Sequence, residues 1–302
     1  SEIDASDRHS RTLRSLSWSS DGQTLAVCSF DATTSLWREE ERSIGSGALR
    51  FTNVSVLSGH ENEVKSASYS PSGALMATCS RDRSVWIYDA SDDADEYECV
   101  ALLQSHTQDV KMVKWHPKQE VVFSCSYDDT VKVWGPDGDD WCCKETLEGH
   151  ESTVWAMSFD AAGSRFVTCS DDRSLRVWAP TSSSRPGEAE KKTETEPVHR
   201  GSLVASAAFL SPLFMSGASL AANSRSSSEK ASGSESRVTP IDASCNWSVV
   251  SVIKEEHPRP IYSVDWLQKS DFIASGCGDN RIRVFQPKDG KLSSWSCVAD
   301  VE

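Results

Sequence analysis

The chain has 302 residues, 38% of them hydrophobic, which is enough for a sizeable core and indicates one or two globular domains. Its 45 acidic residues outnumber its 31 basic residues, for a formal net charge of -14. Because neutralising phosphates takes clustered cations, this balance argues against general binding of nucleic acid or of an anionic membrane. The opening residues, SEIDASDRHS, lack the apolar core of a secretory signal. We therefore expect free thiols in a reducing compartment.

A fixed spacing of histidine, aspartate and an aromatic residue recurs five times along the chain. Each aspartate follows its histidine by 22 residues, and each aromatic residue follows the aspartate by six. A catalytic dyad is needed once, whereas a structural bond is needed in every unit, so the repetition favours a structural role over a hydrolase or metal site. In chain order the triplets are His9–Asp31–Trp37, His60–Asp82–Tyr88, His106–Asp128–Trp134, His150–Asp172–Trp178 and His257–Asp279–Phe285.

Short segments with alternating polarity lie between these repeated residues and predict strands. In the second unit they read VKSASYS, LMATCS and VWIYDA, and YECVALLQ supplies a fourth strand. We expect five units of four strands each. Their predicted ranges are 11–59, 64–104, 110–149, 154–180 with 246–254, and 261–302.

An insert at residues 181–243 interrupts the fourth unit between its third and fourth strands. It is rich in Ser, Ala, Glu and Lys, a composition typical of disordered and solvated segments. One apolar stretch inside it, residues 203–222, is about as long as a membrane span. Ser and Gly interrupt this stretch and Pro212 breaks it. We therefore expect a weakly ordered loop, with a partner-docking segment as the alternative.

Four strands per unit, with Gly-His near the start and Trp near the end, resemble the WD40 repeat. The resemblance implies an all-β fold, a WD40 β-propeller of four-stranded antiparallel blades, as a single domain over residues 1–302. In that family the repeat His, Asp and Trp form a hydrogen-bond network with a strand Ser or Thr. The resemblance therefore implies a structural blade network of His60, Asp82, His106, Asp128, Trp134, His150, Asp172 and Trp178. The first and fifth copies match less well, since His9 lacks the preceding Gly and Phe285 lacks an indole N–H.

Four cysteines follow the same period, each three residues before a repeat aspartate: Cys28, Cys79, Cys125 and Cys169. Cysteine at a fixed strand position predicts small apolar packing between blades. The alternative is a ring of thiols around a metal, which blade symmetry would hold too far apart. No Cys-x-x-Cys pair occurs, so we expect neither a metal nor a cofactor.

Five blades fall short of the seven with which WD40 propellers usually close, and closure removes exposed sheet edges. Three interpretations are open: a fragment that lacks two blades, a smaller closed ring, and pairing of the chain with itself. The first is favoured.

Several longer stretches resemble the WD40 subunit of the cytosolic iron–sulfur protein assembly machinery. They include GHENEVKSASYSPSGALMATCSRDRSVWIYD, LEGHESTVWAMSFD and CSDDRSLRVW within residues 11–180, and then RPIYSVDW and CGDNRIRVF. The resemblance implies a non-catalytic adaptor of the cytoplasm, and also of the nucleus, that delivers clusters to apo iron–sulfur client proteins. It implies a targeting complex with a MIP18-type protein and a HEAT-repeat MMS19-type protein, and docking of an iron-only-hydrogenase-like cluster carrier. The sequence departs from the family in its five blades and its long insert.

Two other classes of function compete with the assembly adaptor. The alternative to the adaptor is a WD40 scaffold of another pathway, such as a substrate receptor of a ubiquitin ligase. An enzyme is disfavoured, because the sequence has no nucleophile elbow, no phosphate-binding loop and no unrepeated acid–base pair. We expect no catalytic residues.

One rim of the predicted propeller, here called the top face, carries the repeat histidines and the turns of the repeat aspartates. The acidic runs 38–42, 91–98 and 136–140 follow third strands and belong to the opposite rim. We therefore expect the top face to capture an acidic, aromatic-ended peptide, which fits the family's recognition of client tails. In the alternative, Lys65 and Lys111 are solvated charges and only Arg81 matters. The predicted partner-binding residues are Arg14, Phe30, Lys65, Arg81, Lys111, Tyr127, Trp155 and Tyr262.

Overall fold

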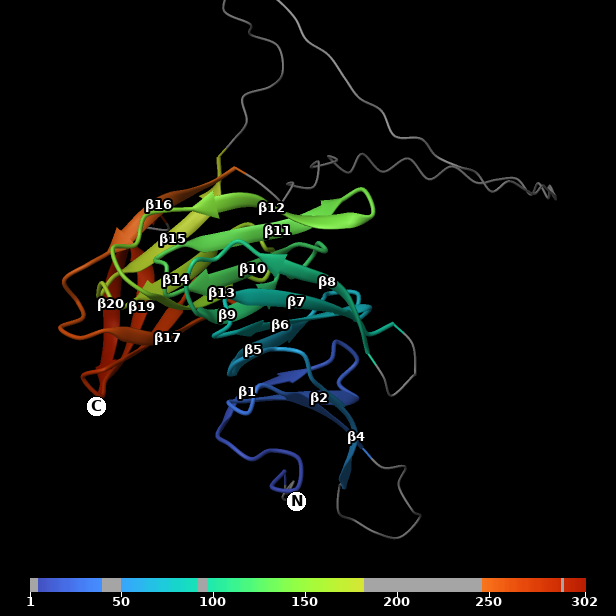
Figure 1. Cartoon of the computed structure of the whole chain (residues 1–302). Coiled ribbons are helices and arrows are strands. Elements are labelled where there is room, and N and C mark those ends of the chain that lie inside the picture. The colour runs from blue at the N-terminus through green and yellow to red at the C-terminus, as the bar shows by residue number, and fades with distance from the viewer. Residues whose placement is uncertain (1–4, 40–49, 92–96, 182–245, 289–290) are drawn as a thin grey trace, which may run out of the picture. The chain divides into compact units, whose positions relative to one another are not determined.

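The computed structural model describes residues 5–39, 50–91, 97–181, 246–288 and 291–302. They belong to one compact unit, and Figure 1 shows them as β-strands joined by short loops. No helix in these ranges is long and apolar enough to cross a membrane. The predicted insert, with its apolar stretch, lies outside the described residues except for Thr181.

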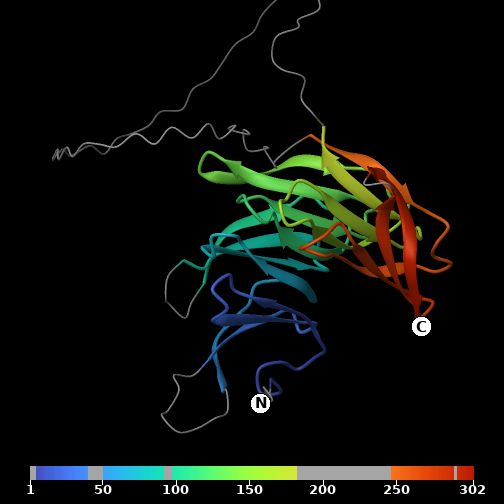
Figure 2. The same ribbon diagram turned by 180° about the vertical axis from the view of Figure 1, so that it is seen from behind.

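The described strands form five sheets, whose members run side by side when seen from the front and from behind (Figures 1 and 2). The first sheet holds β1 (Leu13–Trp18), β2 (Thr24–Ser29), β3 (Thr34–Glu39) and β4 (Phe51–Leu57). The second holds β5 (Val64–Tyr69), β6 (Leu75–Ser80), β7 (Ser84–Asp89) and β8 (Glu98–Gln104). The third holds β9 (Val110–Trp115), β10 (Val122–Ser126), β11 (Val131–Asp137) and β12 (Asp140–Leu147). The fourth holds β13 (Val154–Phe159), β14 (Phe166–Ser170), β15 (Leu175–Pro180) and β16 (Trp247–Ile253). The fifth holds β17 (Ile261–Trp266), β18 (Ile273–Cys277), β19 (Ile282–Lys288) and β20 (Lys291–Val301).

Each sheet is antiparallel, and its strands pair in chain order. The prediction of five four-stranded units is therefore confirmed, and the predicted range 64–104 coincides with the span from Val64 to Gln104. The fourth sheet is completed across the insert, where Leu175 of β15 pairs with Ile253 of β16. Strand pairing thus restores the fourth unit even though more than sixty residues separate its last two strands in the sequence.

The hydrophobic core lies between successive sheets. The first strand of each later sheet packs against the first two strands of the sheet before it, as β9 packs on β5 and β6. One core cluster accordingly joins Ala77 and Cys79 of β6 to Val113 and Trp115 of the third sheet. In the first four sheets the second strands are buried on both faces, and the four repeat cysteines on them are inaccessible to solvent, as the sequence predicts.

Two turn glycines with nearly the same backbone conformation differ in their surroundings. Gly163, with φ of +72°, lies against the ring of His116 and against Pro117, and a Cβ there would collide with that ring. Gly22, with φ of +73°, has no atom within 4 Å of the position where a Cβ would be. Both need the left-handed conformation that other residues adopt only at a cost.

We expect Gly163→Ala to lower the free energy of unfolding by about 3 kcal/mol, because backbone strain and overpacking against His116 add. Gly22→Ala should cost about 1 kcal/mol, because it adds only the backbone strain. Urea unfolding followed by tryptophan fluorescence measures both. Equal losses in the two variants would contradict the packing described for Gly163.

Candidate functional site

The third sheet shows how each repeat histidine is held. Nδ1 of His106 donates to Oδ2 of Asp128 at 2.8 Å, and its Nε2 lies 2.7 Å from Oγ of Ser124. The indole Nε1 of Trp134 donates to the same Oγ at 2.8 Å, and the backbone N–H of Thr107 donates to Asp128 at 3.0 Å. Every polar atom of the buried imidazole therefore has a partner, as buried polar groups require.

Burial and charge fix the protonation states of this pair. Burial alone would raise the pKa of Asp128. The hydrogen bond from His106, and the positive charge that His106 carries once it is protonated in acid, outweigh burial and hold the pKa of Asp128 well below its usual range. Burial lowers the pKa of His106, against the opposing effect of Asp128. The pair is thus a neutral imidazole donating to a carboxylate, which suits a structural bond better than a proton-transfer pair.

The same bond recurs in three other sheets. The Nδ1–Oδ2 distances are 3.0 Å for His9–Asp31, 2.7 Å for His60–Asp82 and 2.8 Å for His150–Asp172. The partner of Nε2 is a hydroxyl of the second strand in the second and fourth sheets, from Thr78 and Thr168 respectively. In the first sheet Ser35 of β3 takes this place and also accepts from the indole of Trp37.

The fifth sheet departs from the pattern. Nε2 of His257 still meets Oγ of Ser275 at 2.8 Å, but its Nδ1 is buried and has no hydrogen-bond partner among the described residues. Oδ2 of Asp279 instead accepts from Arg283 at 2.7 Å. Burial is the larger cause that lowers the pKa of His257 to about 4, and the charge of Arg283 is the next. The spacing of His257 and Asp279 therefore does not produce a bond in this copy.

Side chains that could bind a metal do not come together in the part of the chain that the structure describes. Within the described ranges, no three His, Cys, Asp or Glu side chains lie close enough together to hold a metal ion. Burial raises the pKa of the Cys28 thiol to about 12 and that of Cys125 well above its ordinary value. Such thiols are poor nucleophiles and poor ligands, because both roles need the thiolate.

Three basic side chains of the first two sheets meet around one carboxylate, that of Glu63. Nζ of Lys65 lies 4.1 Å from the ring centre of Phe30 and pairs with Glu63. The guanidinium of Arg11 also pairs with Glu63, at 2.9 Å. Arg81 follows β6, and its side chain is 52% exposed; its guanidinium lies 3.7 Å from Glu63 and 3.9 Å from Asp109 of the third sheet.

The contacts continue across the remaining sheets. Nζ of Lys111 pairs with Asp109 at 3.2 Å and lies about equally far from the ring centres of Tyr127, at 5.0 Å, and Trp155, at 5.1 Å. The rings of Trp155 and Tyr262 then meet edge to face, with their centres 5.3 Å apart. Seven of the eight predicted partner-binding residues thus belong to one series of contacts over five sheets, here called the top-face ladder. It consists of Phe30, Lys65, Arg81, Lys111, Tyr127, Trp155 and Tyr262 with the acids Glu63 and Asp109.

The top face carries two acids that were not predicted, and one alternative about its lysines needs correction. Glu63 and Asp109 lie among the predicted cations, and each precedes a lysine by two residues, just before the strand that carries it. Lys65 and Lys111 are also not solvated charges, since their side chains are only 12% and 11% exposed. Sequence reasoning missed the acids although the pattern acid-Val-Lys occurs in both strands. Arg14 is exposed on β1, and the described residues show no contact between it and the ladder.

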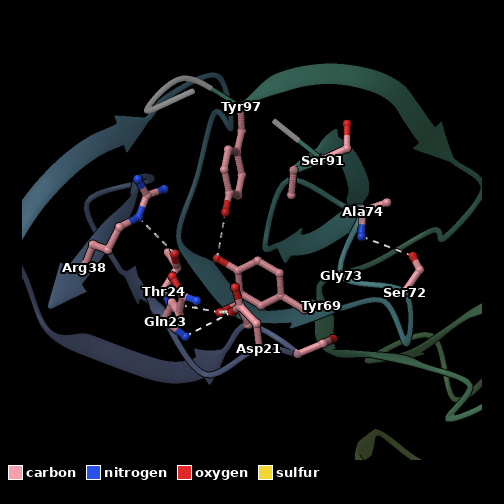
Figure 3. A pocket seen from close by; sticks show the side chains of 13 residues that line it. Asp21, Gln23, Thr24, Arg38, Tyr69, Ser72, Gly73, Ala74, Ser91 and Tyr97 are labelled. Carbon is pink, nitrogen blue, oxygen red and sulfur yellow. Dashed lines mark hydrogen bonds between the residues drawn. The ribbon is translucent and has the colours of Figure 1, made fainter. Parts of the chain in front are cut away.

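A separate hollow of about 290 Å³ lies at the opposite rim, between loops of the first and second sheets. Figure 3 shows the hydroxyls of Tyr69 and Tyr97 facing each other, 3.4 Å apart, and Arg38 reaching toward Thr24. Oγ of Ser19 donates to Asp21 at 2.5 Å. These lining groups bond to one another. No motif in the sequence pointed to this hollow.

Comparison with known proteins agrees with the repeat. A family model described as WD domain, G-beta repeat, matches residues 5–38, 51–89, 97–135, 141–179 and 247–286. The chain is 41% identical over 107 residues to the probable cytosolic iron-sulfur protein assembly protein 1 of Vanderwaltozyma polyspora, covering 32% of this chain and 30% of that protein. The protein of the same name from Candida glabrata is 42% identical over 90 residues, covering 30% of this chain and 27% of that protein. A relative from Caenorhabditis elegans, the probable cytosolic iron-sulfur protein assembly protein CIAO1 homolog, is 43% identical over 82 residues, covering 27% of this chain and 22% of that protein. The alignment thus spans less than a third of the length of each of these curated relatives.

We expect Asp128→Asn to lower the free energy of unfolding by about 2 kcal/mol, because it removes the charge that His106 and the backbone amides of Thr107 and Thr130 bind. The adjacent Asp129→Asn is the matched control. Asp129 has φ of +67°, which Asn tolerates well, and burial together with the nearby carboxylates raises its pKa. Its replacement should leave stability within about 0.5 kcal/mol or raise it. Chemical denaturation measures both, and an equal effect of the two changes would contradict the assigned network.

His257 should make stability depend on pH. Its folded pKa is about 4, below the 6.5 of a free imidazole, so the unfolded chain binds the proton more tightly. The stability it supports is therefore complete above pH 6.5 and is lost as the pH falls from 6.5 toward 4. Between pH 7 and 4.5 the wild type should lose roughly 2 kcal/mol more than His257→Gln. Parallel stability curves for the two proteins, from thermal unfolding at each pH, would refute this assignment.

Proposed function

The chain belongs to the WD40 repeat family, and from this premise we propose that it is a non-catalytic scaffold in cytosolic iron–sulfur protein assembly. The observation that carries a scaffold role is the top-face ladder, a continuous series of aromatic, basic and acidic side chains contributed by five sheets. The pathway is supported by the names of relatives that are 41 to 43% identical over their aligned regions.

The chemistry of the blades supports a scaffold better than an enzyme. Four of the repeat histidines are bound at both ring nitrogens, one in each of four sheets, and are therefore engaged in structure. The repeat cysteines are buried, so a cluster would pass through the assembly as cargo without ligands from these thiols. Recognition then rests with the rims, where side chains are exposed.

The top-face ladder has the chemistry to receive an acidic peptide with an aromatic end. Arg81 is held near Glu63 and Asp109 at distances longer than a hydrogen bond, so its guanidinium can still donate to a carboxylate. Tyr127 and Tyr262 are half-exposed and flank Lys111 and Trp155, which gives an aromatic ligand a surface to pack on. Lys111 packs on the rings of Tyr127 and Trp155, and Trp155 packs on Tyr262, so little ordering of these side chains would accompany binding.

The proposed partners follow from the same role. A MIP18-type protein and a HEAT-repeat protein would share a targeting complex with this chain, and a cluster carrier of the iron-only-hydrogenase type would dock on it. Apo iron–sulfur proteins of the cytoplasm and nucleus would be the clients. Arg and aromatic side chains are the usual energetic anchors of such interfaces, and both are present on the top face.

Replacing Arg81 with Glu should weaken capture of the acidic partner at least tenfold, since it reverses a half-exposed charge beside two carboxylates. Lys118→Glu makes the same charge change in the β9–β10 loop at the opposite rim, where Lys118 is exposed, and should leave capture unchanged. Pulldown of the MIP18-type and HEAT-repeat proteins with each variant, alongside thermal unfolding to check the fold, provides the measurement. Undiminished capture by the Arg81 variant, or equal loss with Lys118→Glu, would count against the proposed face.

A further inference from the structure

The first strand of every described sheet ends in an aromatic residue, and the second sheet differs from the others in which residue it has. In the third and fifth sheets a tryptophan stands there and meets a second tryptophan of the fourth strand edge to face, as Trp115 meets Trp141 with ring centres 5.7 Å apart. In the second sheet Tyr69 meets Tyr97, with ring centres 6.4 Å apart. Two phenols thus stand where the third and fifth sheets have indoles.

The two phenols bring polar groups into the hollow between the loops of the first and second sheets (Figure 3). Their hydroxyl oxygens lie 3.4 Å apart, which is longer than the usual O–H···O distance of about 2.5 to 3.0 Å. Burial raises the pKa of Tyr69, so its phenol stays neutral and can both donate and accept. Tyr69 is only 7% exposed, and buried polar groups normally have well-formed bonds. The hollow therefore offers hydrogen-bonding capacity that the described residues leave unused.

Asp21 adds a fixed negative charge to the lining of the hollow. Its Oδ1 accepts from Oγ of Ser19 at 2.5 Å and from the backbone N–H of Gln23 at 3.0 Å. Its Oδ2 has no hydrogen-bond partner among the described residues. The hydrogen bond from Ser19, followed by that from Gln23, lowers the pKa of Asp21, so the carboxylate is charged at neutral pH. One oxygen of a charged and immobilised carboxylate is thus available to a ligand.

The arginine that lines the hollow does not neutralise this carboxylate. Nε of Arg38 donates to Oγ1 of Thr24 at 3.4 Å, and Figure 3 shows the side chain at one side of the hollow. The charge of Arg38 is a smaller cause of the lowered pKa of Asp21 than either hydrogen bond to that carboxylate. Within the described ranges the two groups form no ion pair.

Further acids lie next to the residues that line the hollow. Asp89 accepts from the backbone N–H and from Oγ of Ser91, a lining residue, at 2.9 and 2.5 Å. Glu39 and Glu98 are exposed, and each directly follows a lining residue in the sequence. Together with Asp21 these acids outnumber the one arginine in the lining. The local charge therefore favours a cationic ligand over an anionic one.

We propose that this hollow, here called the tyrosine hollow and defined by Asp21, Tyr69 and Tyr97, receives a lysine or arginine side chain from a basic segment of a partner protein. Oδ2 of Asp21 and the phenol oxygens accept from the cationic group, and the apolar stem of the side chain packs on the tyrosine rings. The volume of about 290 Å³ lies below the roughly 300 to 1,000 Å³ of pockets that bury drug-sized ligands, so it suits one side chain. The acidic rim around the hollow attracts a basic segment.

Isothermal titration calorimetry of the full 302-residue chain with capped pentapeptides tests the proposal. The peptides read Gly-Ser-X-Ser-Gly, with lysine, norleucine or glutamate at X, and inorganic phosphate is a further probe. The lysine peptide should bind best, because only it offers both an apolar stem and a positive charge. Tighter binding of the glutamate peptide or of phosphate would overturn the proposal and assign the hollow to an anion held by Arg38. Equal binding of the norleucine peptide would overturn it too, because the charge would then play no part.

Variants of the lining separate this site from general attraction to an acidic protein. Asp21→Asn should weaken binding of the lysine peptide about fivefold, the effect of one exposed ion pair. Tyr97→Phe keeps the ring but removes a hydroxyl, and should weaken binding about threefold. Asp140→Asn is the matched control: Asp140 is exposed on β12 at the same rim, and its replacement makes the same change in net charge. This control should leave binding unchanged.

Thermal unfolding checks that each variant is folded, and Asn at position 21 keeps a side-chain oxygen for the bonds from Ser19 and Gln23. An equal loss in the Asp21 and Asp140 variants would show that only net charge attracts the peptide, and would overturn the proposal. Wild-type affinity in both lining variants would overturn it as well. A wild type that does not bind the lysine peptide at millimolar concentration would have the same consequence.

Discussion

The buried bond between a histidine and an aspartate is the contact on which the arrangement of each of the first four sheets depends. The loop that enters a sheet and the turn between its second and third strands come together at one edge, and both bring polar backbone groups out of water. A buried N–H without a hydrogen-bond partner costs more folding free energy than a formed hydrogen bond contributes. These edges therefore need an acceptor that reaches several donors. A carboxylate such as that of Asp128 meets this need, because it accepts from the imidazole and from amides of both segments. A histidine–aspartate pair that resembles a catalytic dyad in the sequence thereby holds two loops together.

The fold could be predicted almost completely, since it rests on features local to each unit. Alternation of polarity marks the strands, and the constant separation of histidine and aspartate sets the unit length, so the second predicted range coincides with β5 to β8. The candidate site was predictable only in part. Repeat positions indicated which side chains share the top face, and seven of the eight lie in one series of contacts. The acids that hold Arg81 were missed, because such pairs join neighbouring sheets and depend on distances that no single unit encodes.

Interior positions are shared by every sheet, whereas rim positions can distinguish this protein. Interior positions repeat with small variation, as the buried cysteines of the second strands show. Rim positions vary from sheet to sheet, so that lysine in the second and third sheets is followed by Trp155 in the fourth and Tyr262 in the fifth. Recognition of a partner needs this variation, because a surface of identical units would offer the same contact several times over. The residues that differ most from sheet to sheet therefore lie on the rims, while the interior encodes only the architecture.

The one histidine that lacks its aspartate lies in the one described sheet that has no following sheet packed on it. An arginine near the aspartate does not by itself explain the difference, because Arg176 occupies the position of Arg283 in the fourth sheet and Asp172 there still accepts from His150. What distinguishes the fourth sheet is that β17 covers β14, whereas the corresponding strand β18 of the fifth sheet has no such cover among the described residues. Arg283 pairs instead with Asp279 and with Asp300 of β20, and one of its guanidinium nitrogens is buried without a hydrogen-bond partner among the described residues. Among the described sheets, the one in which the histidine–aspartate bond is absent is thus the one whose aspartate accepts from an arginine that also pairs with the fourth strand.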